Sequence, residues 1–225
     1  MPKLFTKAII GLLSLALTMS VAIFLPAWTL DYWQGWACLA VFFGSSAVVT
    51  VYLMKRDPAL LERRLKAGAS AEKEKSQKRI QSLTRILFLS LLALPALDHR
   101  FGWSRVPAIA SIGGDALIAI GFAIIFFVFK ENTYTSGVIE VADGQRVIST
   151  GPYALVRHPM YSGALFMLAG IPVALGSWWG LLPVVPMAAA IAWRLIDEEK
   201  FLSANLPGYS EYLRKVRYRL APLVW

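Results

Sequence analysis

Four long stretches of the sequence carry almost no charged residues, and this limits the fold more than any other feature. They cover residues 8–30, 32–54, 106–128 and 158–193, and Asp115 is the only Asp, Glu, Lys or Arg in any of them. Each is longer than the roughly 20 residues that a helix needs to cross a bilayer. A chain that is 57% hydrophobic and only 16% charged is therefore predicted to be an all-α, polytopic integral membrane bundle.

The basic residues predict how these helices are oriented. Lys3 and Lys7 precede the first helix, and ten Lys or Arg residues lie within residues 55–85. Basic residues collect on the cytoplasmic side of membrane helices, so both termini and this segment are predicted to be cytoplasmic. The first apolar stretch is long for a signal peptide and has no cleavage pattern after it, so we expect no cleaved signal peptide.

The basic segment also bears on the partners of the chain. Residues 55–85 contain no aromatic side chain on which a base would stack, so we expect no nucleic-acid binding. Contact with anionic lipid head groups, from a partly helical cytosolic loop, is the simpler interpretation. A weaker third span is predicted at residues 80–97. Counting this third span, residues 1–130 are predicted to form a four-helix transmembrane region. Residues 131–225 are predicted to form a catalytic and cofactor-binding region.

The last apolar stretch, residues 158–193, is too long for one span and too short for two full spans with a loop. The sequence "GSWWG" at residues 176–180 interrupts it near the middle. We therefore predict a hairpin of two short helices, each reaching about 24 Å or less, which gives five or six spans in total. Both ends of the hairpin then lie on the cytosolic side, with His158 close to Arg194, and an amphipathic cytosolic helix is predicted near the C-terminus.

Polar residues gather at the two ends of this hairpin. Arg194 and Glu198 are spaced i, i+4 and so share a helix face. Each polar residue taken alone fits a membrane anchor or an interfacial ion pair, but their convergence favours a functional site. Because the chain has two histidines and one cysteine, we expect no metal site, and no phosphate-binding loop or serine-nucleophile motif is present. The gathered residues are Tyr153, Arg157, His158, Tyr161, Arg194, Glu198 and Glu199.

The order "GQRVISTGPYALVRHPMYSG", an apolar hairpin, "RLIDEEKFL" and "LPGYSEYLRKVRYRL" resembles the isoprenylcysteine carboxyl methyltransferase family. It resembles the related membrane phospholipid methyltransferases more loosely. The resemblance covers the chain from about Gln145 to the C-terminus. It implies a methyltransferase that binds S-adenosylmethionine in a cytosol-facing pocket without a Rossmann domain.

The resemblance also implies which residues form the site. It makes Arg194 the substrate-side arginine, and Glu140 is the nearest match to a further polar contact of the family. We predict that Arg194 and Glu198 are the catalytic residues. By the chemistry of the residues themselves, Arg157 or His158 is a candidate partner for the carboxylate of the cofactor, and Glu199 adds a second acid beside Glu198. The full cofactor-binding set is Gln145, Arg146, Val147, Ile148, Tyr153, Arg157, His158, Pro159, Met160, Tyr161, Glu198 and Glu199.

The methyl acceptor is left open by the residues. A carboxylate is already ionised and needs only orientation, which a guanidinium such as Arg194 provides. An amine needs a base, for which Glu198, Glu199 or His158 are candidates, and a thiol must become a thiolate. We favour a lipid-like or prenylated carboxylate, with a phospholipid amine or a small thiol as the alternative.

A small transporter or membrane scaffold is the alternative of another class. An ionisable residue inside a span is a functional candidate by default, but Asp115 stands alone and follows two glycines, so we favour a structural role for it. The sequence shows no inverted repeat of the kind that many transporters have. Both observations count against transport.

Overall fold

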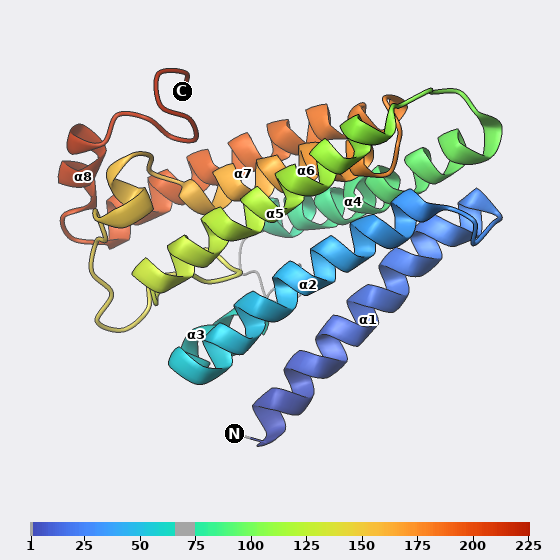
Figure 1. Cartoon of the computed structure of the whole chain (residues 1–225). Coiled ribbons are helices and arrows are strands. Elements are labelled where there is room, and N and C mark those ends of the chain that lie inside the picture. The colour runs from blue at the N-terminus through green and yellow to red at the C-terminus, as the bar shows by residue number, and fades with distance from the viewer. Residues whose placement is uncertain (1, 66–74) are drawn as a thin grey trace.

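The computed structural model describes residues 2–65 and 75–225 (Figure 1). This part of the chain contains helices and loops and no strand, so the all-α prediction is confirmed. Residues 66–74 of the predicted basic loop lie outside the described residues. The helices are α1 (Pro2–Ala27), α2 (Trp33–Arg56), α3 (Pro58–Leu65), α4 (Lys75–Phe101), α5 (Ala108–Glu131), α6 (Pro159–Ala174), α7 (Val184–Asn205) and α8 (Tyr209–Lys215), with 3-10 turns at Gly151–Ala154 and Trp179–Leu181.

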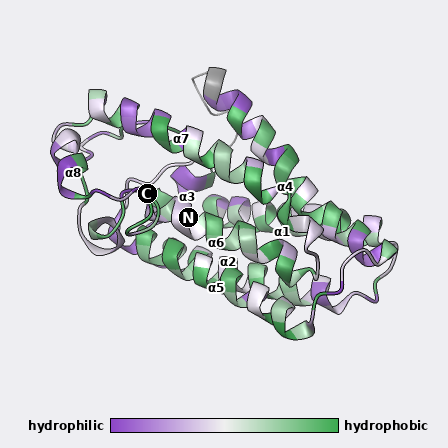
Figure 2. Ribbon diagram, turned by 90° about the horizontal axis from the view of Figure 1, so that it is seen from above, coloured by the Kyte–Doolittle hydropathy of each residue, from purple (hydrophilic) through white to green (hydrophobic). Residues whose placement is uncertain are grey.

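Five of the described helices are long and apolar enough to cross a membrane, and α6 is a sixth, shorter apolar helix of 16 residues. At 1.5 Å per residue α6 reaches about 24 Å, as the sequence predicted. The outer face of α1 exposes large apolar side chains such as Leu13 and Leu17, which suits contact with lipid. Figure 2 shows hydrophobic residues along the bundle and hydrophilic ones gathered on α3, α8 and the start of α4. The candidate spans are Lys3–Ala27, Trp33–Arg56, Gln77–Phe101, Ala108–Glu131 and Trp179–Asn205.

The basic segment 55–85 is more helical than the sequence suggested. The short helix α3 occupies its first part, where the Asp57 carboxylate accepts a hydrogen bond from the Leu60 N–H at 2.9 Å and Pro58 begins the helix. Helix α4 begins at Lys75 rather than near residue 80 and continues to Phe101. Strong helix formers such as Lys, Gln and Arg extend it into the basic segment.

The last apolar stretch breaks where the sequence predicted. Helix α6 ends at Ala174, Gly176 adopts a positive φ of 74°, and α7 begins at Val184. The prediction that the second arm is as short as the first is wrong. Helix α7 has 22 residues and continues past Arg194 to Asn205, because residues 194–202 are mostly good helix formers.

Helix α6 packs most closely against α5, a partner that the hairpin hypothesis did not name. Glycines on the two helices let their backbones approach. A Cβ atom built on Gly121 would lie 2.5 Å from the carbonyl oxygen of Gly163, and one on Gly170 would lie 2.7 Å from that of Gly114. The pairing runs antiparallel, and it fixes the position of the residues that precede α6.

The tightest of these contacts gives a prediction about stability. A Cβ on Gly114 would lie 2.2 Å from the backbone nitrogen of Ala174, whereas one on Gly113 would meet nothing within 4 Å. Gly114→Ala is therefore expected to destabilise the fold by about 2 kcal/mol, the cost of overpacking against a backbone that cannot move aside. Gly113→Ala, its neighbour on the same helix, should leave stability unchanged. Thermal unfolding in detergent measures both, and equal melting temperatures for the two variants would contradict the packing described.

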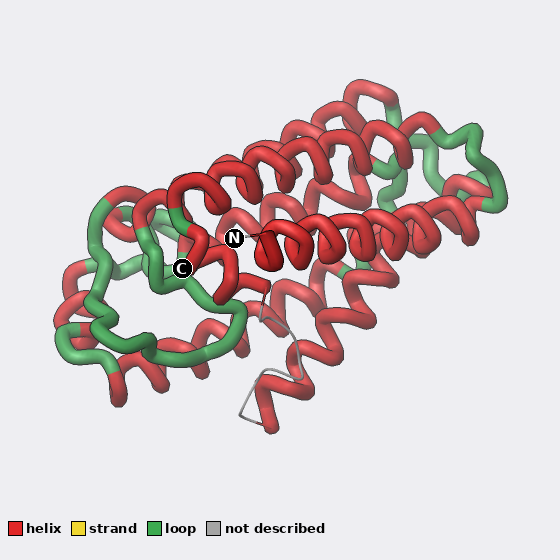
Figure 3. The backbone as a smooth tube through the Cα atoms, turned by 90° about the horizontal axis from the view of Figure 1, so that it is seen from below, coloured by secondary structure: helices red, strands yellow, loops and turns green. Residues whose placement is uncertain are grey.

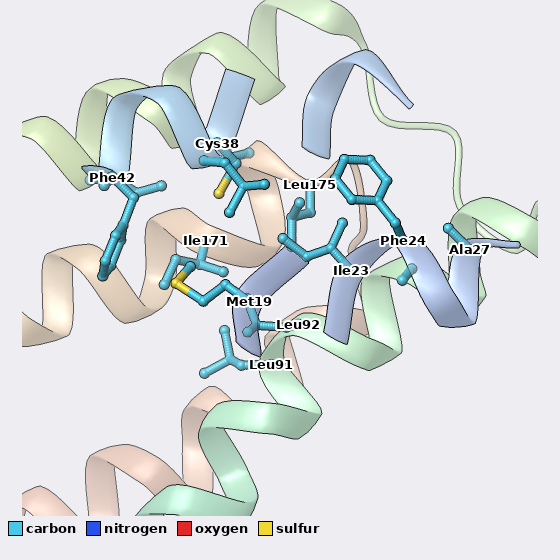
Figure 4. Packing of buried hydrophobic residues seen from close by; sticks show 14 of the residues in the cluster. Met19, Ile23, Phe24, Ala27, Cys38, Phe42, Leu91, Leu92, Ile171 and Leu175 are labelled. Atoms are coloured by element: carbon cyan, nitrogen blue, oxygen red, sulfur yellow. The ribbon is translucent and has the colours of Figure 1, made fainter. Parts of the chain in front are cut away.

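The main core lies where α1, α2, α4, α6 and α7 meet. Figure 4 shows Met19, Ile23, Cys38, Leu91 and Ile171 of α1, α2, α4 and α6 packed together. Met187, Ile191 and Leu195 of α7 belong to the same cluster. Close packing of this kind holds α6 and α7 in a fixed relation. As a result, the start of α6 and the second half of α7 lie at one end of the bundle.

Asp115 lies inside α5 and is 9% exposed. One of its carboxylate oxygens and the hydroxyl of Ser111, one turn earlier, have no hydrogen-bond partner among the described residues. The structural role expected for Asp115 stays a prediction.

Candidate active site

The longest loops gather at the end of the bundle where α5, α7 and the C-terminal segment meet (Figure 3). Here the segment 132–158 folds between α5 and α6, and α8 lies beside it (Figure 1). A cavity at this end has an empty volume of about 800 Å³, part of which is open to solvent.

The cavity lining matches the cofactor-binding set predicted from sequence, with one exception. Every member of that set except Glu199 lines the cavity, and so does Glu140. Arg194 does not line it. Further lining residues that were not predicted come from the loop after α5 and from the C-terminal part: Asn132, Tyr134, Thr135, Ser136, Val138, Ile139, Leu202, Leu206, Tyr209 and Tyr212.

The two arms of the predicted hairpin meet through Tyr161. Its hydroxyl donates to a carboxylate oxygen of Glu198 at 2.7 Å and accepts from Arg194 Nε at 3.2 Å. One turn earlier on α6, Nε2 of His158 lies 3.2 Å from a carboxylate oxygen of Glu199. The sequence predicted His158 close to Arg194, and the structure brings both to the same end of the bundle, where Arg194 bonds to Tyr161, one turn after His158. There α6 and α7 touch through side chains rather than along their whole length.

Each nitrogen of the Arg194 guanidinium already has a protein partner. Besides the bond to Tyr161, Nη1 donates to the side-chain oxygen of Gln77 at 2.8 Å, and Nη2 donates to the carbonyl oxygen of Gly137 at 3.1 Å. Gln77 also donates to Asp197 at 2.9 Å. Arg194 therefore connects α4, α6, α7 and the loop after α5.

Glu199 lies behind the cavity, in a cluster of charges. One of its oxygens is 3.2 Å from Nε of Arg157 and from Nε2 of His158, and the other accepts from Nε of Arg219 at 3.0 Å. The contact to Arg157 is an ion pair without hydrogen-bond alignment. Glu199 is 7% exposed. The cluster holds "RHP" and the C-terminal segment together, so this geometry favours a structural role for Glu199.

Removing the Glu199 charge should therefore cost stability. Glu199→Gln leaves the buried Arg157 without its counter-charge, which is expected to destabilise the fold by about 3 kcal/mol. Glu211→Gln, on the exposed surface of α8, removes the same charge and should have no effect. Thermal unfolding of both variants in detergent is the measurement. A Glu199→Gln variant as stable as the wild type would show that the cluster does not hold the fold together.

The C-terminal segment after α8 supports the motif from outside, which the sequence did not predict. The backbone N–H groups of Arg157 and His158 donate to the carbonyl oxygens of Tyr218 and Arg219, both at 2.9 Å. The hydroxyl of Ser162 donates to the Leu220 carbonyl oxygen at 2.6 Å. The two backbone bonds pair residues 157–158 with residues 218–219. Together with the Ser162 bond, they fix the position of the chain where it enters α6.

Tyr153 has its hydroxyl at the cavity and its backbone tied to α8. The hydroxyl accepts a hydrogen bond from the side-chain amide of Asn132 at 3.0 Å, and the carbonyl oxygen accepts from the Tyr212 hydroxyl at 2.9 Å. Burial raises the pKa of the Tyr153 hydroxyl, so it stays protonated near neutral pH. The polar run "ENTYTS" at residues 131–136 is a sequence feature that could have pointed to this wall of the cavity, but it did not enter the prediction.

The sequence of the chain matches that of a known protein family. Residues 109–207 match the sequence model of a family described as phospholipid methyltransferase. No curated protein matches the chain. The matched region runs from α5 to the end of α7 and includes the cavity-lining motif before α6. The match supports a membrane-bound methyltransferase.

Proposed function

We propose that the protein is an S-adenosylmethionine-dependent integral membrane methyltransferase, similar to isoprenylcysteine carboxyl methyltransferases, that methylates a lipid-like acceptor. The observation that carries the proposal is the cavity in which the loop after α5, the "GPYALVRHPMY" motif and Glu198 on α7 come together. This motif, the apolar hairpin and the acidic part of α7 follow one another in the same order as in the isoprenylcysteine carboxyl methyltransferase family, which the sequence resembles.

The chemistry of the lining suits the proposed cofactor. S-adenosylmethionine carries an amino-acid carboxylate, cationic ammonium and sulfonium groups, a ribose diol and an adenine ring. Arg157 and Arg146 supply positive charge for the carboxylate, and Glu198 and Glu140 supply acceptors for cations and hydroxyls. Tyrosine rings at Tyr153, Tyr209 and elsewhere offer faces for a ring or a cation.

The work of the protein residues in this proposal is alignment. The bound cofactor supplies an activated methyl group, so no residue has to act as a covalent nucleophile. The side chains hold the two reactants in line and keep water out. Tyr161, bound to both Glu198 and Arg194, links the cavity to the neighbouring substrate-side arginine.

A carboxylate is the favoured acceptor group because of Arg194. Its guanidinium lies one hydrogen bond from the cavity residue Tyr161 and also donates to a backbone carbonyl of the surrounding loop. A substrate carboxylate that displaced that carbonyl would receive a charge-assisted bond in its place. No general base is then needed, since a carboxylate is ionised at neutral pH.

A phospholipid amine is the second candidate, favoured by the description of the matched family, which names phospholipids. An amine must lose a proton, and Glu198 at the cavity wall is the nearest acid for that step. A small thiol is the remaining alternative within this class.

Localisation and domain organisation belong to the same proposal. The basic helix α3 and the basic C-terminal segment lie at one end of the bundle (Figure 1), and α3 bonds there to the loop 132–140 that lines the cavity. By the distribution of positive charge we assign this end to the cytosol and the lipophilic acceptor to the bilayer. Residues 1–130 then serve as the membrane region and residues 131–225 as the catalytic region, with Gln77 and α3 of the first contacting the second.

The proposal is tested with purified protein, labelled S-adenosylmethionine and total membrane lipid. We expect a labelled lipid product from which mild base releases the label as methanol, because a methyl ester hydrolyses whereas an N-methyl or S-methyl group keeps its methyl. A labelled phospholipid whose label mild base does not release as methanol would favour the amine candidate. No transfer to any lipid fraction, with the protein folded and bound to the cofactor, would remove the lipid acceptor from the proposal.

A further inference from the structure

The short helix α3 is outside the region that matches the methyltransferase family, yet it holds one wall of the cavity. That wall is the loop 132–140, which contributes a large share of the cavity lining. The loop has no regular secondary structure in this stretch, and a loop of this kind adopts one conformation only if its backbone groups find fixed partners.

Three side chains at α3 provide such partners. Nη2 of Arg63 donates to the carbonyl oxygen of Thr133, and the hydroxyl of Thr133 donates in turn to the carboxylate of Asp57. Nη1 of Arg64 donates to the carbonyl oxygen of Ser136 at 2.7 Å. Two of the three are charge-assisted bonds from guanidinium groups to carbonyl oxygens, and such bonds are stronger than neutral ones.

Helix α3 is itself firmly held. Leu60 and Leu61 are 0% and 5% exposed and pack in one cluster with Val128 and Phe129 at the end of α5. The guanidinium of Arg64 lies over the Phe129 ring, 5.4 Å from its centre. Because α3 and the end of α5 move as one packed unit, the arginines present their donors to the loop from a fixed position.

Arg64 also lies within electrostatic reach of the cavity. Its charge interacts with Tyr153, Tyr161 and Glu198, all of which line the cavity. Desolvation lowers the pKa of the Arg64 guanidinium, although an arginine remains charged at neutral pH in any case.

We propose that Arg63 and Arg64 are positioning residues of the donor cavity: they hold the loop 132–140 in its binding conformation and so set the affinity for the methyl donor. The identity of that donor rests on the proposed function, whereas the loop contacts do not. The site would then extend beyond the family-matched region into the first half of the chain.

The test compares Arg64→Gln with Arg56→Gln. Arg56 is an exposed arginine at the end of α2, so its variant removes the same charge without touching the loop. Arg64→Gln is expected to speed amide hydrogen exchange in residues 132–140 and to raise the Kd for S-adenosylmethionine about tenfold, the effect of one lost charged hydrogen bond. Turnover at saturating donor should change less than about twofold, since the lost interaction affects binding alone. Arg56→Gln should match the wild type in amide exchange, in the Kd and in turnover.

The outcomes separate this inference from the proposed function. Wild-type protein that binds no S-adenosylmethionine would contradict the proposed function. Faster amide exchange in residues 132–140 of Arg64→Gln would still support the inference that Arg64 holds this loop. Unchanged exchange and an unchanged Kd in Arg64→Gln would overturn the inference even though the wild type binds. If Arg64→Gln does not fold, Arg63→Gln decides the matter: it should show the same two changes to a smaller extent, and wild-type behaviour would overturn the inference.

Discussion

Glu198→Gln is expected to weaken S-adenosylmethionine binding by about 10- to 100-fold. The amide keeps the size of the side chain and an oxygen that can accept from Tyr161, whose hydroxyl lies 2.7 Å from the carboxylate, but it removes the negative charge from the cavity wall. A hydrogen bond between charged groups contributes about 1.5 to 3 kcal/mol, and each 1.4 kcal/mol is tenfold in affinity. Isothermal titration calorimetry on the detergent-purified variant measures the change.

Glu211→Gln is the matched control for this variant, because Glu211 is exposed on α8 and does not line the cavity. It should bind as the wild type does. A Glu198→Gln variant with wild-type affinity would mean that Glu198 does not contact the cofactor. The hydrogen bond between Glu198 and Tyr161 would then have a structural role.

Arg194→Ala is expected to reduce turnover about 100-fold and to change the Kd for S-adenosylmethionine much less. The guanidinium does not line the cavity, so a rise in the Kd should come only through the loop 132–140 and should stay at about the tenfold expected for Arg64→Gln. It does position Tyr161 and the loop carbonyl of Gly137, and a displacement of about 1 Å in a catalytic group can reduce the rate on the order of 100-fold. Single-turnover kinetics with the lipid acceptor, beside calorimetry, separates the two quantities.

Arg194→Lys keeps a positive charge but has no planar fork, so it should recover only part of the turnover. Equal loss of binding and turnover in Arg194→Ala would assign the arginine to the cofactor instead of the acceptor. Full activity in Arg194→Lys would show that its charge alone matters.

Much of the fold could be predicted from the sequence because the membrane restricts it. Uncharged runs of sufficient length have to be helices, since backbone groups inside a bilayer need internal partners. The break at Gly176 and the meeting of His158 with α7 followed from the length of one apolar run. The extent of α7 could not be predicted in this way, because the charged residues after Arg194 are compatible both with a loop and with a continued helix.

The predicted cofactor residues came from a resemblance in sequence, and the structure brings all but one of them to a single cavity. The remaining walls were missed for a physical reason. The loop 132–140 is held by Arg63, Arg64, Gln81 and Arg194, which come from three helices distant in sequence. Glu199 was taken for a cavity residue because it adjoins Glu198, but one step along a helix turns a side chain by about 100°.

Calorimetric titration of purified wild-type protein with S-adenosylmethionine tests whether this cavity binds a methyl donor. We expect saturable binding of one molecule per chain, weakened by Glu198→Gln and unchanged by Glu211→Gln. No binding heat at any cofactor concentration, from protein that still unfolds cooperatively on heating, would contradict the assignment of this cavity to a methyl donor.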